Sequence, residues 1–114
     1  MKQTAMWCHK DVSDRRPYCG FSSSEHHCRI GYGDSLPVVE VMVREASPAD
    51  KDKPEYWSFW EEKDDNGNPI PGAFAPCFTW PKRSMVEMCF TYGPEAHAEK
   101  YGGGMMRVVV EEIA

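Results

Sequence analysis

Residues 36–46 read LPVVEVMVREA, and this stretch decides how the rest of the chain is interpreted. Val39, Val41 and Val43 recur at every second position, the period of a strand that buries one face. A second valine-rich stretch, MMRVVVEEI, lies near the end of the chain at residues 105–113. We expect both stretches to be strands of one sheet and to pair with each other.

Two aromatic stretches between these valine-rich segments predict a hairpin. They are EYWSFWEE at 55–62 and AFAPCFTW at 73–80, and the segment DDNGNPIPG joins them. Asn66-Gly67 is a favoured pair for a tight hairpin turn, because the central residues need positive φ. Pro76 lies inside the second stretch and indicates an edge strand or a bulge, since proline donates no ladder hydrogen bond.

Two helices are expected after the hairpin. The stretch SMVEMCFTYG at 84–93 opens with Ser84 and Glu87, the spacing of a capping box. Its apolar residues recur at helical spacing and predict one buried stripe. The stripe consists of Met85, Met88, Cys89 and Tyr92. PEAHAEKY at 94–101 predicts a second, short helix that starts with proline.

The remaining residues, 1–35, show no sustained period and are expected to be irregular. The predicted fold class is therefore α+β: a small antiparallel sheet of about four strands, with one or two helices on one face, preceded by an irregular Cys/His-rich segment. The chain has 114 residues, which fits a single domain, 1–114, with residues 36–114 as its body.

Three of the five cysteines and three of the four histidines lie between residues 7 and 28. Zinc prefers thiolate and imidazole ligands, and a bound ion would order a segment that lacks its own core. The spacing lacks the close C-x2-C pairs of structural zinc sites, so buried small hydrophobic cysteines are the alternative. The predicted ligands are Cys8, Cys19, His27 and Cys28, with His9 and His26 as substitutes. Cys77 and Cys89 are expected to pack in the core.

The formal net charge is −5, and it is uneven: residues 1–35 sum to +1 and residues 36–114 to −6. Such a body disfavours direct nucleic-acid binding, which depends on Lys and Arg, and suits a basic protein partner. No apolar run is long enough to span a membrane. The N-terminus lacks the apolar region of a secretory signal, so a cytoplasmic location is expected.

These patterns favour a small acidic cytoplasmic protein-binding module. It is expected to act as an inhibitor that blocks a basic site on a nucleic-acid-handling complex, by physical analogy with small phage-type inhibitors and anti-CRISPR proteins. The alternatives are a zinc- or thiol-dependent enzyme that uses the N-terminal cluster, and a zinc-stabilised nucleic-acid-binding module. No nucleotide-binding or hydrolase motif is present. The predicted partner contacts are Asp50, Asp52, Glu55, Trp57, Trp60, Glu61, Glu62, Asp64 and Asp65.

Overall fold

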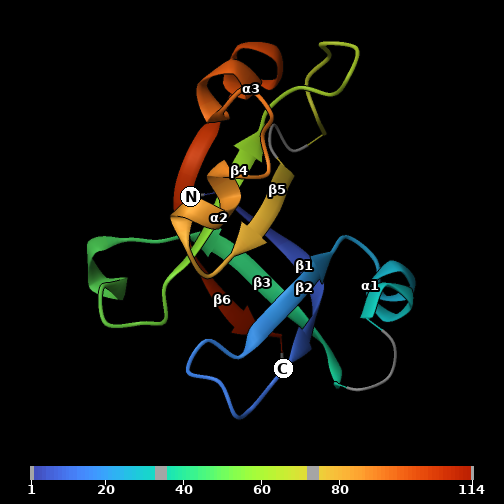
Figure 1. Ribbon diagram of the computed structural model, residues 1–114, viewed down its shortest axis with the longest axis vertical. Coiled ribbons are helices and arrows are strands. Elements are labelled where there is room, and N and C mark those ends of the chain that lie inside the picture. Colours follow the sequence, from blue (N-terminus) through green and yellow to red (C-terminus); the bar gives the residue numbers. More distant parts are fainter. Residues whose placement is uncertain (1, 33–35, 72–74, 114) are drawn as a thin grey trace. The chain divides into compact units, whose positions relative to one another are not determined.

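The computed structural model describes residues 2–32, 36–71 and 75–113. In this part of the chain the fold is mostly antiparallel sheet with three short helices (Figure 1). Six strands are hydrogen-bonded in the order β2-β1-β3-β6-β4-β5. The prediction of about four strands with helices on one face is therefore wrong. The strands are β1 (Gln3–Lys10), β2 (Tyr18–Ser22), β3 (Val38–Glu45), β4 (Tyr56–Glu61), β5 (Ala75–Trp80) and β6 (Gly104–Glu112).

The residues fall into two compact units. Unit 1 comprises Gln3–Pro54 and Val109–Ala114, and unit 2 comprises Glu55–Val108 together with Lys2. β6 begins in unit 2 and ends in unit 1. Unit 1 holds helix α1 (Glu25–Tyr32), and unit 2 holds helices α2 (Arg83–Glu87) and α3 (Pro94–Tyr101).

The segment predicted to be irregular contains the two strands that the sequence analysis did not predict, β1 and β2. β1 pairs with β3 over seven residues, from Gln3 opposite Arg44 to His9 opposite Val38. Met6 and Cys8 are buried along β1 at the two-residue spacing of a strand. The alternation is easily missed in the sequence if Cys and His are considered only as metal ligands. Both residue types also occur in protein cores.

Unit 1 confirms the prediction for the first valine-rich stretch. Val41 and Val43 in β3 are fully buried and Val39 is partly buried, in keeping with the alternating pattern. β3 and β6 are neighbours in the sheet, so the predicted pairing of the two valine-rich strands is also confirmed.

Unit 2 contains the predicted hairpin of β4 and β5, which pair antiparallel. The turn is tight, because the Gly67 amide donates to the Asp64 carbonyl oxygen at 3.0 Å. The Asp64 carboxylate also accepts the amides of Asn66 and Asn68, at 2.9 Å each. The predicted irregularity near Pro76 is found nearby, where the β4–β5 register shifts between Ser58 and Phe59.

α3 matches its prediction, but α2 does not. α2 ends at Glu87, and its N-cap is Lys82 rather than the predicted Ser84. The predicted apolar stripe is wrong as well, since Met88 and Tyr92 are 83 % and 87 % exposed. Val86 and Phe90 are buried instead and pack on Phe59 of β4. The helical spacing fails as a guide here because the chain leaves the helix after a single turn or so.

Candidate functional site

Three side chains with metal-ligand chemistry meet in unit 2. They are Glu61 at the end of β4, Cys77 in β5 and His97 in α3, and their ligand atoms all lie within 4.8 Å of one another. All three are partly buried. Within the described ranges, this is the one group of three or more Cys, His, Asp or Glu that meets this distance limit.

The strand register explains how two of these side chains meet. Phe59 lies opposite Cys77, and Glu61 lies opposite Ala75. Phe59 and Glu61 are two residues apart and share one face of β4, so Glu61 and Cys77 form a diagonal cross-strand pair on that face. α3 lies against β4 and supplies the third member, His97.

His97 is held in place by both polar and aromatic contacts. Its Nε2 atom lies 3.1 Å from Oε2 of Glu61, and each side chain is 19 % exposed. The imidazole ring packs edge-on against Phe59 and contacts the rings of Phe90 and Tyr101, with centroid separations of 4.8, 4.3 and 4.3 Å. The ring orientation is therefore fixed by its neighbours on three sides.

The thiol of Cys77 is protonated at neutral pH. Burial, with a further contribution from the negative charge of Glu61, raises the pKa of this thiol to about 12. A cysteine nucleophile requires the opposite, a thiolate stabilised by a nearby positive charge. Cys77, Glu61 and His97 are thus poorly suited to thiol catalysis in the metal-free chain.

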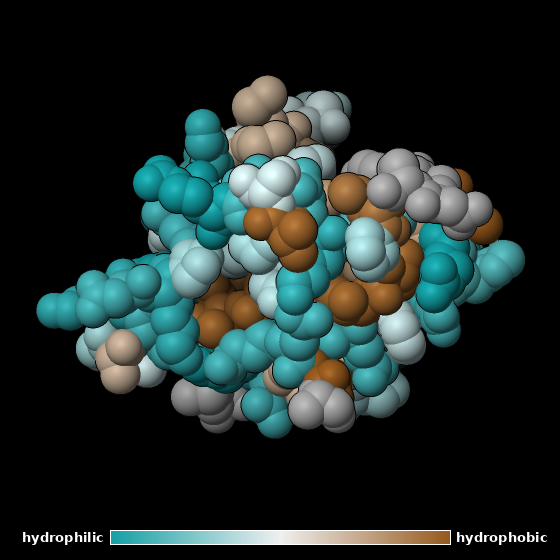
Figure 2. All heavy atoms as spheres, turned by 90° about the horizontal axis from the view of Figure 1, so that it is seen from below, coloured by the Kyte–Doolittle hydropathy of each residue, from teal (hydrophilic) through white to brown (hydrophobic). Residues whose placement is uncertain are grey.

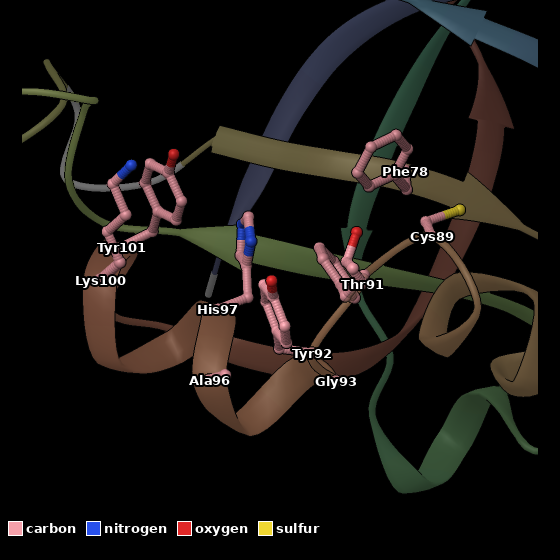
Figure 3. A pocket seen from close by; sticks show the side chains of 10 residues that line it. Phe78, Cys89, Thr91, Tyr92, Gly93, Ala96, His97, Lys100 and Tyr101 are labelled. Atoms are coloured by element: carbon pink, nitrogen blue, oxygen red, sulfur yellow. The ribbon is translucent and has the colours of Figure 1, made fainter.

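An open recess borders His97 on the outside of unit 2. Its volume is about 480 Å³, and its walls come from β5, the segment after α2, and α3. Figure 3 shows His97 rising from α3 between Tyr92 and Tyr101, with Phe78 and Cys89 farther along. The lining is mainly aromatic, with one cation. It includes Phe78, Phe90, Tyr92, His97, Lys100 and Tyr101.

Phe78 lines this recess, and its backbone conformation is strained. Its φ is 58°, in the left-handed region that bulky residues rarely adopt. Phe78 is the extra residue of the β4–β5 irregularity, since Cys77 and Thr79 on either side of it pair with the adjacent residues Phe59 and Ser58. This conformation turns the ring toward Phe90, at a centroid separation of 5.5 Å, and leaves 46 % of Phe78 exposed. Such strain is often found at binding sites.

The predicted zinc ligands lie in unit 1, on three different elements. Cys8 is buried in β1, Cys19 is partly buried in β2, and Cys28 is buried in α1. The Cys28 thiol donates to the Gly20 carbonyl oxygen, whereas His27 is exposed and its Nδ1 atom lies 2.7 Å from Ser24 Oγ.

Burial raises the pKa of all three thiols in unit 1, that of Cys8 to about 12. Cys8, Cys19, His27 and Cys28 do not form a ligand group by the distance limit that Glu61, Cys77 and His97 meet. Zinc at these four residues stays a prediction. The two substitute ligands, His9 and His26, have different surroundings. His9 is buried, with its Nε2 atom 2.9 Å from the Cys28 carbonyl oxygen, whereas His26 is exposed.

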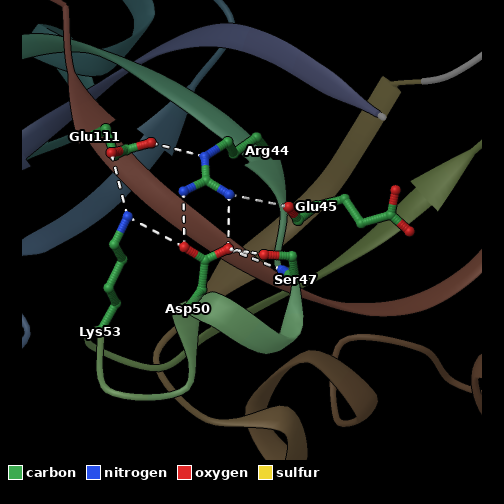
Figure 4. A network of polar contacts seen from close by, with 6 residues as sticks. All are labelled: Arg44, Glu45, Ser47, Asp50, Lys53 and Glu111. Atoms are coloured by element: carbon green, nitrogen blue, oxygen red, sulfur yellow. Dashed lines mark hydrogen bonds and ion pairs between the residues drawn. The ribbon is translucent and has the colours of Figure 1, made fainter.

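The predicted partner contacts do not all reach the surface. Trp60 is fully buried, and Asp50 is buried in an ion-pair network with Arg44, Lys53 and Glu111 (Figure 4). Trp57 is partly buried, and its indole nitrogen donates to Glu55. The predicted contacts that are exposed are Asp52, Glu62, Asp64 and Asp65.

Glu61, one of the predicted partner contacts, belongs instead to the Cys/His/Glu group. The sequence patterns predict a core position for Cys77 and indicate no role for His97. The usable signal was the diagonal position of Glu61 and Cys77 across the hairpin, but it depends on a strand register that the sequence alone leaves open.

The chain matches no known protein family, no curated protein and no solved structure. Among the described residues, no helix is both long enough and apolar enough to cross a membrane.

Proposed function

We propose that this chain is a protein-binding module that uses the aromatic recess of unit 2 and its rim as the contact surface. The proposal rests on one observation: large apolar side chains stay exposed around this recess. Tyr92 and Phe78 line it, and Met88 precedes the lining residue Cys89. Tyr92 and Met88 are more than four-fifths exposed. Hydrophobic residues also reach the surface on the face drawn in Figure 2, which is seen from below the view of Figure 1.

The side-chain types fit a protein partner. Tyrosine and other aromatic residues dominate binding hot spots, and methionine adapts its shape to irregular apolar surfaces. Exposed apolar side chains cost solubility, so a cluster of them beside a hollow favours an interaction site over a plain surface.

Charge indicates the chemistry of that partner. Residues 55–108 carry eight acidic and five basic side chains. The Tyr101 hydroxyl, on the recess wall, donates to the carboxylate of Asp65 at 2.8 Å, so the turn that carries Asp64 and Asp65 borders the recess. The partner is a basic protein segment that places an apolar side chain in the recess and its Lys or Arg side chains near Glu62, Asp64 and Asp65.

Blocking a basic site on a nucleic-acid-handling complex is the biological role that we propose for this binding. An acidic surface would compete with the phosphate backbone for the same Lys and Arg side chains. The acids available for this are Glu62, Asp64 and Asp65, which are exposed, whereas Asp50 is buried in its own ion-pair network.

Tyr92→Ala is expected to weaken binding of a basic-apolar peptide at least about 10-fold, the loss typical of a hot-spot aromatic residue. The peptides come from a random-peptide display library selected on the wild-type protein, and affinity is measured by isothermal titration calorimetry. Because Tyr92 is 87 % exposed, the free energy of unfolding should change by less than about 0.5 kcal/mol.

The matched controls are Val12→Ala and Ile30→Ala, which remove other exposed apolar side chains, both in unit 1. They should leave peptide affinity unchanged. The proposal is wrong if selection enriches no peptides with both an apolar and a basic residue, or if the enriched peptides bind the Tyr92 variant as tightly as wild type.

A further inference from the structure

We propose that Glu61, Cys77 and His97 form a binding site for one divalent transition-metal ion of the zinc class. The site goes beyond the proposed binding function and does not depend on it. It also differs from the N-terminal cysteines and histidines, which carry the sequence pattern but do not gather as closely.

The distances are close to those of a metal site. Zinc bonds of about 2.0–2.3 Å in a tetrahedral arrangement place neighbouring ligand atoms about 3.3–3.6 Å apart. The Nε2 atom of His97 and the Oε2 atom of Glu61 are already 3.1 Å apart. The Cys77 sulfur lies within 4.8 Å of a ligand atom of each of these residues, so a closure of about 1.5 Å at most would complete the ligand set.

The donor types select the class of ion. One sulfur, one imidazole nitrogen and one carboxylate oxygen suit zinc and its neighbours cobalt and nickel. Calcium and magnesium prefer ligand sets made only of oxygen, so a thiol at the centre of the group disfavours them.

The supporting structure fits a site that is formed before the ion arrives. Glu61 and Cys77 are on paired strands, and the ring of His97 is fixed by Phe59, Phe90 and Tyr101. Little conformational entropy is then lost on binding. Apolar walls around the ligands also strengthen the attraction between the ion and its donors.

Three protein ligands leave a fourth position open. His97 is shared between the ligand group and the aromatic recess, so the ion would lie close to the recess wall. Zinc sites with three protein ligands hold water or an incoming donor atom at the fourth position, unlike closed structural sites with four protein ligands.

Cobalt(II) titration of chelator-treated protein tests the site directly. We expect one cobalt per chain, a near-ultraviolet thiolate-to-cobalt charge-transfer band and intense visible bands of tetrahedral cobalt. Equimolar zinc should remove these bands. Added imidazole should shift the visible bands, because the fourth position is open.

Variants identify the ligands. Cys77→Ser should abolish the charge-transfer band and lower cobalt affinity at least about 100-fold, and His97→Gln should lower it at least about 10-fold. Cys89→Ser, which changes a thiol of the recess, and Cys8→Ser, which changes a thiol of unit 1, should bind as wild type. Near-ultraviolet circular dichroism of each metal-free variant checks that the fold is retained.

Two results would overturn the inference. One is the absence of a charge-transfer band in wild-type protein at a large excess of cobalt. The other is a band that survives Cys77→Ser and disappears in Cys8→Ser, which would assign the ion to the N-terminal cysteines.

Discussion

Gly103→Ala is expected to lower the free energy of unfolding by more than about 4 kcal/mol, enough to unfold unit 2 in a marginally stable protein. A Cβ atom at this position would lie 1.6 Å from the backbone oxygen of Trp60 and 2.7 Å from its carbonyl carbon. Backbone atoms cannot swing aside as a side chain can, and Trp60 is paired with both β5 and β6. The φ of +72° at Gly103 adds further strain for any residue with a Cβ.

Variants at two other glycines distinguish the effect of the steric clash from that of the positive φ. Gly67 has a φ of +80° with no atom within 4 Å of a built Cβ, so Gly67→Ala should cost only about 1–2 kcal/mol. Gly104 has neither a positive φ nor an atom within 4 Å of a built Cβ, so Gly104→Ala should leave the free energy of unfolding nearly unchanged. Urea denaturation followed by tryptophan fluorescence ranks the three variants. A loss in Gly103→Ala no larger than in Gly67→Ala would show that the close approach is relieved at little cost.

The same glycine affects the candidate metal site. The Tyr101 carbonyl oxygen, at the end of α3, accepts the backbone amides of Glu62 and Lys63 at 2.9 Å each. Gly103 lies two residues after Tyr101 and lets the chain pass close to Trp60 of β4. If the chain is forced away there, α3 should shift and separate His97 from Glu61, so any Gly103→Ala protein that remains folded should bind cobalt more weakly.

Short-range patterns predict those parts of the fold that bury one regular face. The alternating valines of β3 and the turn at Asp64–Gly67 are local features, and the structure contains both. The N-terminal strands escape prediction because Cys8 and His9 are core residues of a type usually read as reactive. The error in α2 has a different cause: Met85 and Met88 have the spacing of a buried stripe, but only tertiary contacts decide that Val86 and Phe90 are buried instead.

The candidate site depends on contacts between residues distant in sequence. His97 is 36 residues from Glu61, and no spacing rule links a helix to the far end of a preceding hairpin. The pairing of Glu61 with Cys77 requires the register of β4 and β5, which a bulge at Phe78 shifts by one residue. A one-residue error would place the two side chains on opposite faces. Sequence patterns therefore favoured the cysteines that are close along the chain over those that are close in space.

Asp50→Asn is expected to lower the Tm by roughly 10 °C at neutral pH, because it breaks a buried ion pair. In wild type the Asp50 carboxylate accepts two hydrogen bonds from Arg44, at 2.8 and 2.9 Å. It also accepts the Ser47 amide at 2.8 Å and pairs with Lys53 at 3.1 Å (Figure 4). The amide of asparagine can accept some of these bonds but offers no charge to Arg44.

The loss of Tm in Asp50→Asn should become smaller as the pH falls. Hydrogen bonds from Arg44, followed by the Ser47 amide, hold the pKa of the Asp50 carboxyl well below its usual range. Since the unfolded chain has an ordinary value of about 3.9, the ion pair stabilises the fold above that pH and is lost as the pH falls toward the lowered folded-state pKa. The Tm difference between wild type and Asp50→Asn should thus be largest near neutrality and shrink below about pH 4.

Asp52→Asn is the matched control, because Asp52 is an exposed acid two residues away. Its Tm should stay within a few degrees of wild type, and its pH profile should follow that of wild type, as expected for a surface charge. If Asp50→Asn and Asp52→Asn behave alike, Asp50 belongs to the acidic surface available to a partner. If only Asp50→Asn is destabilised, Asp50 is a structural charge of unit 1, and the acids left to meet a basic partner are the exposed ones, Glu62, Asp64 and Asp65.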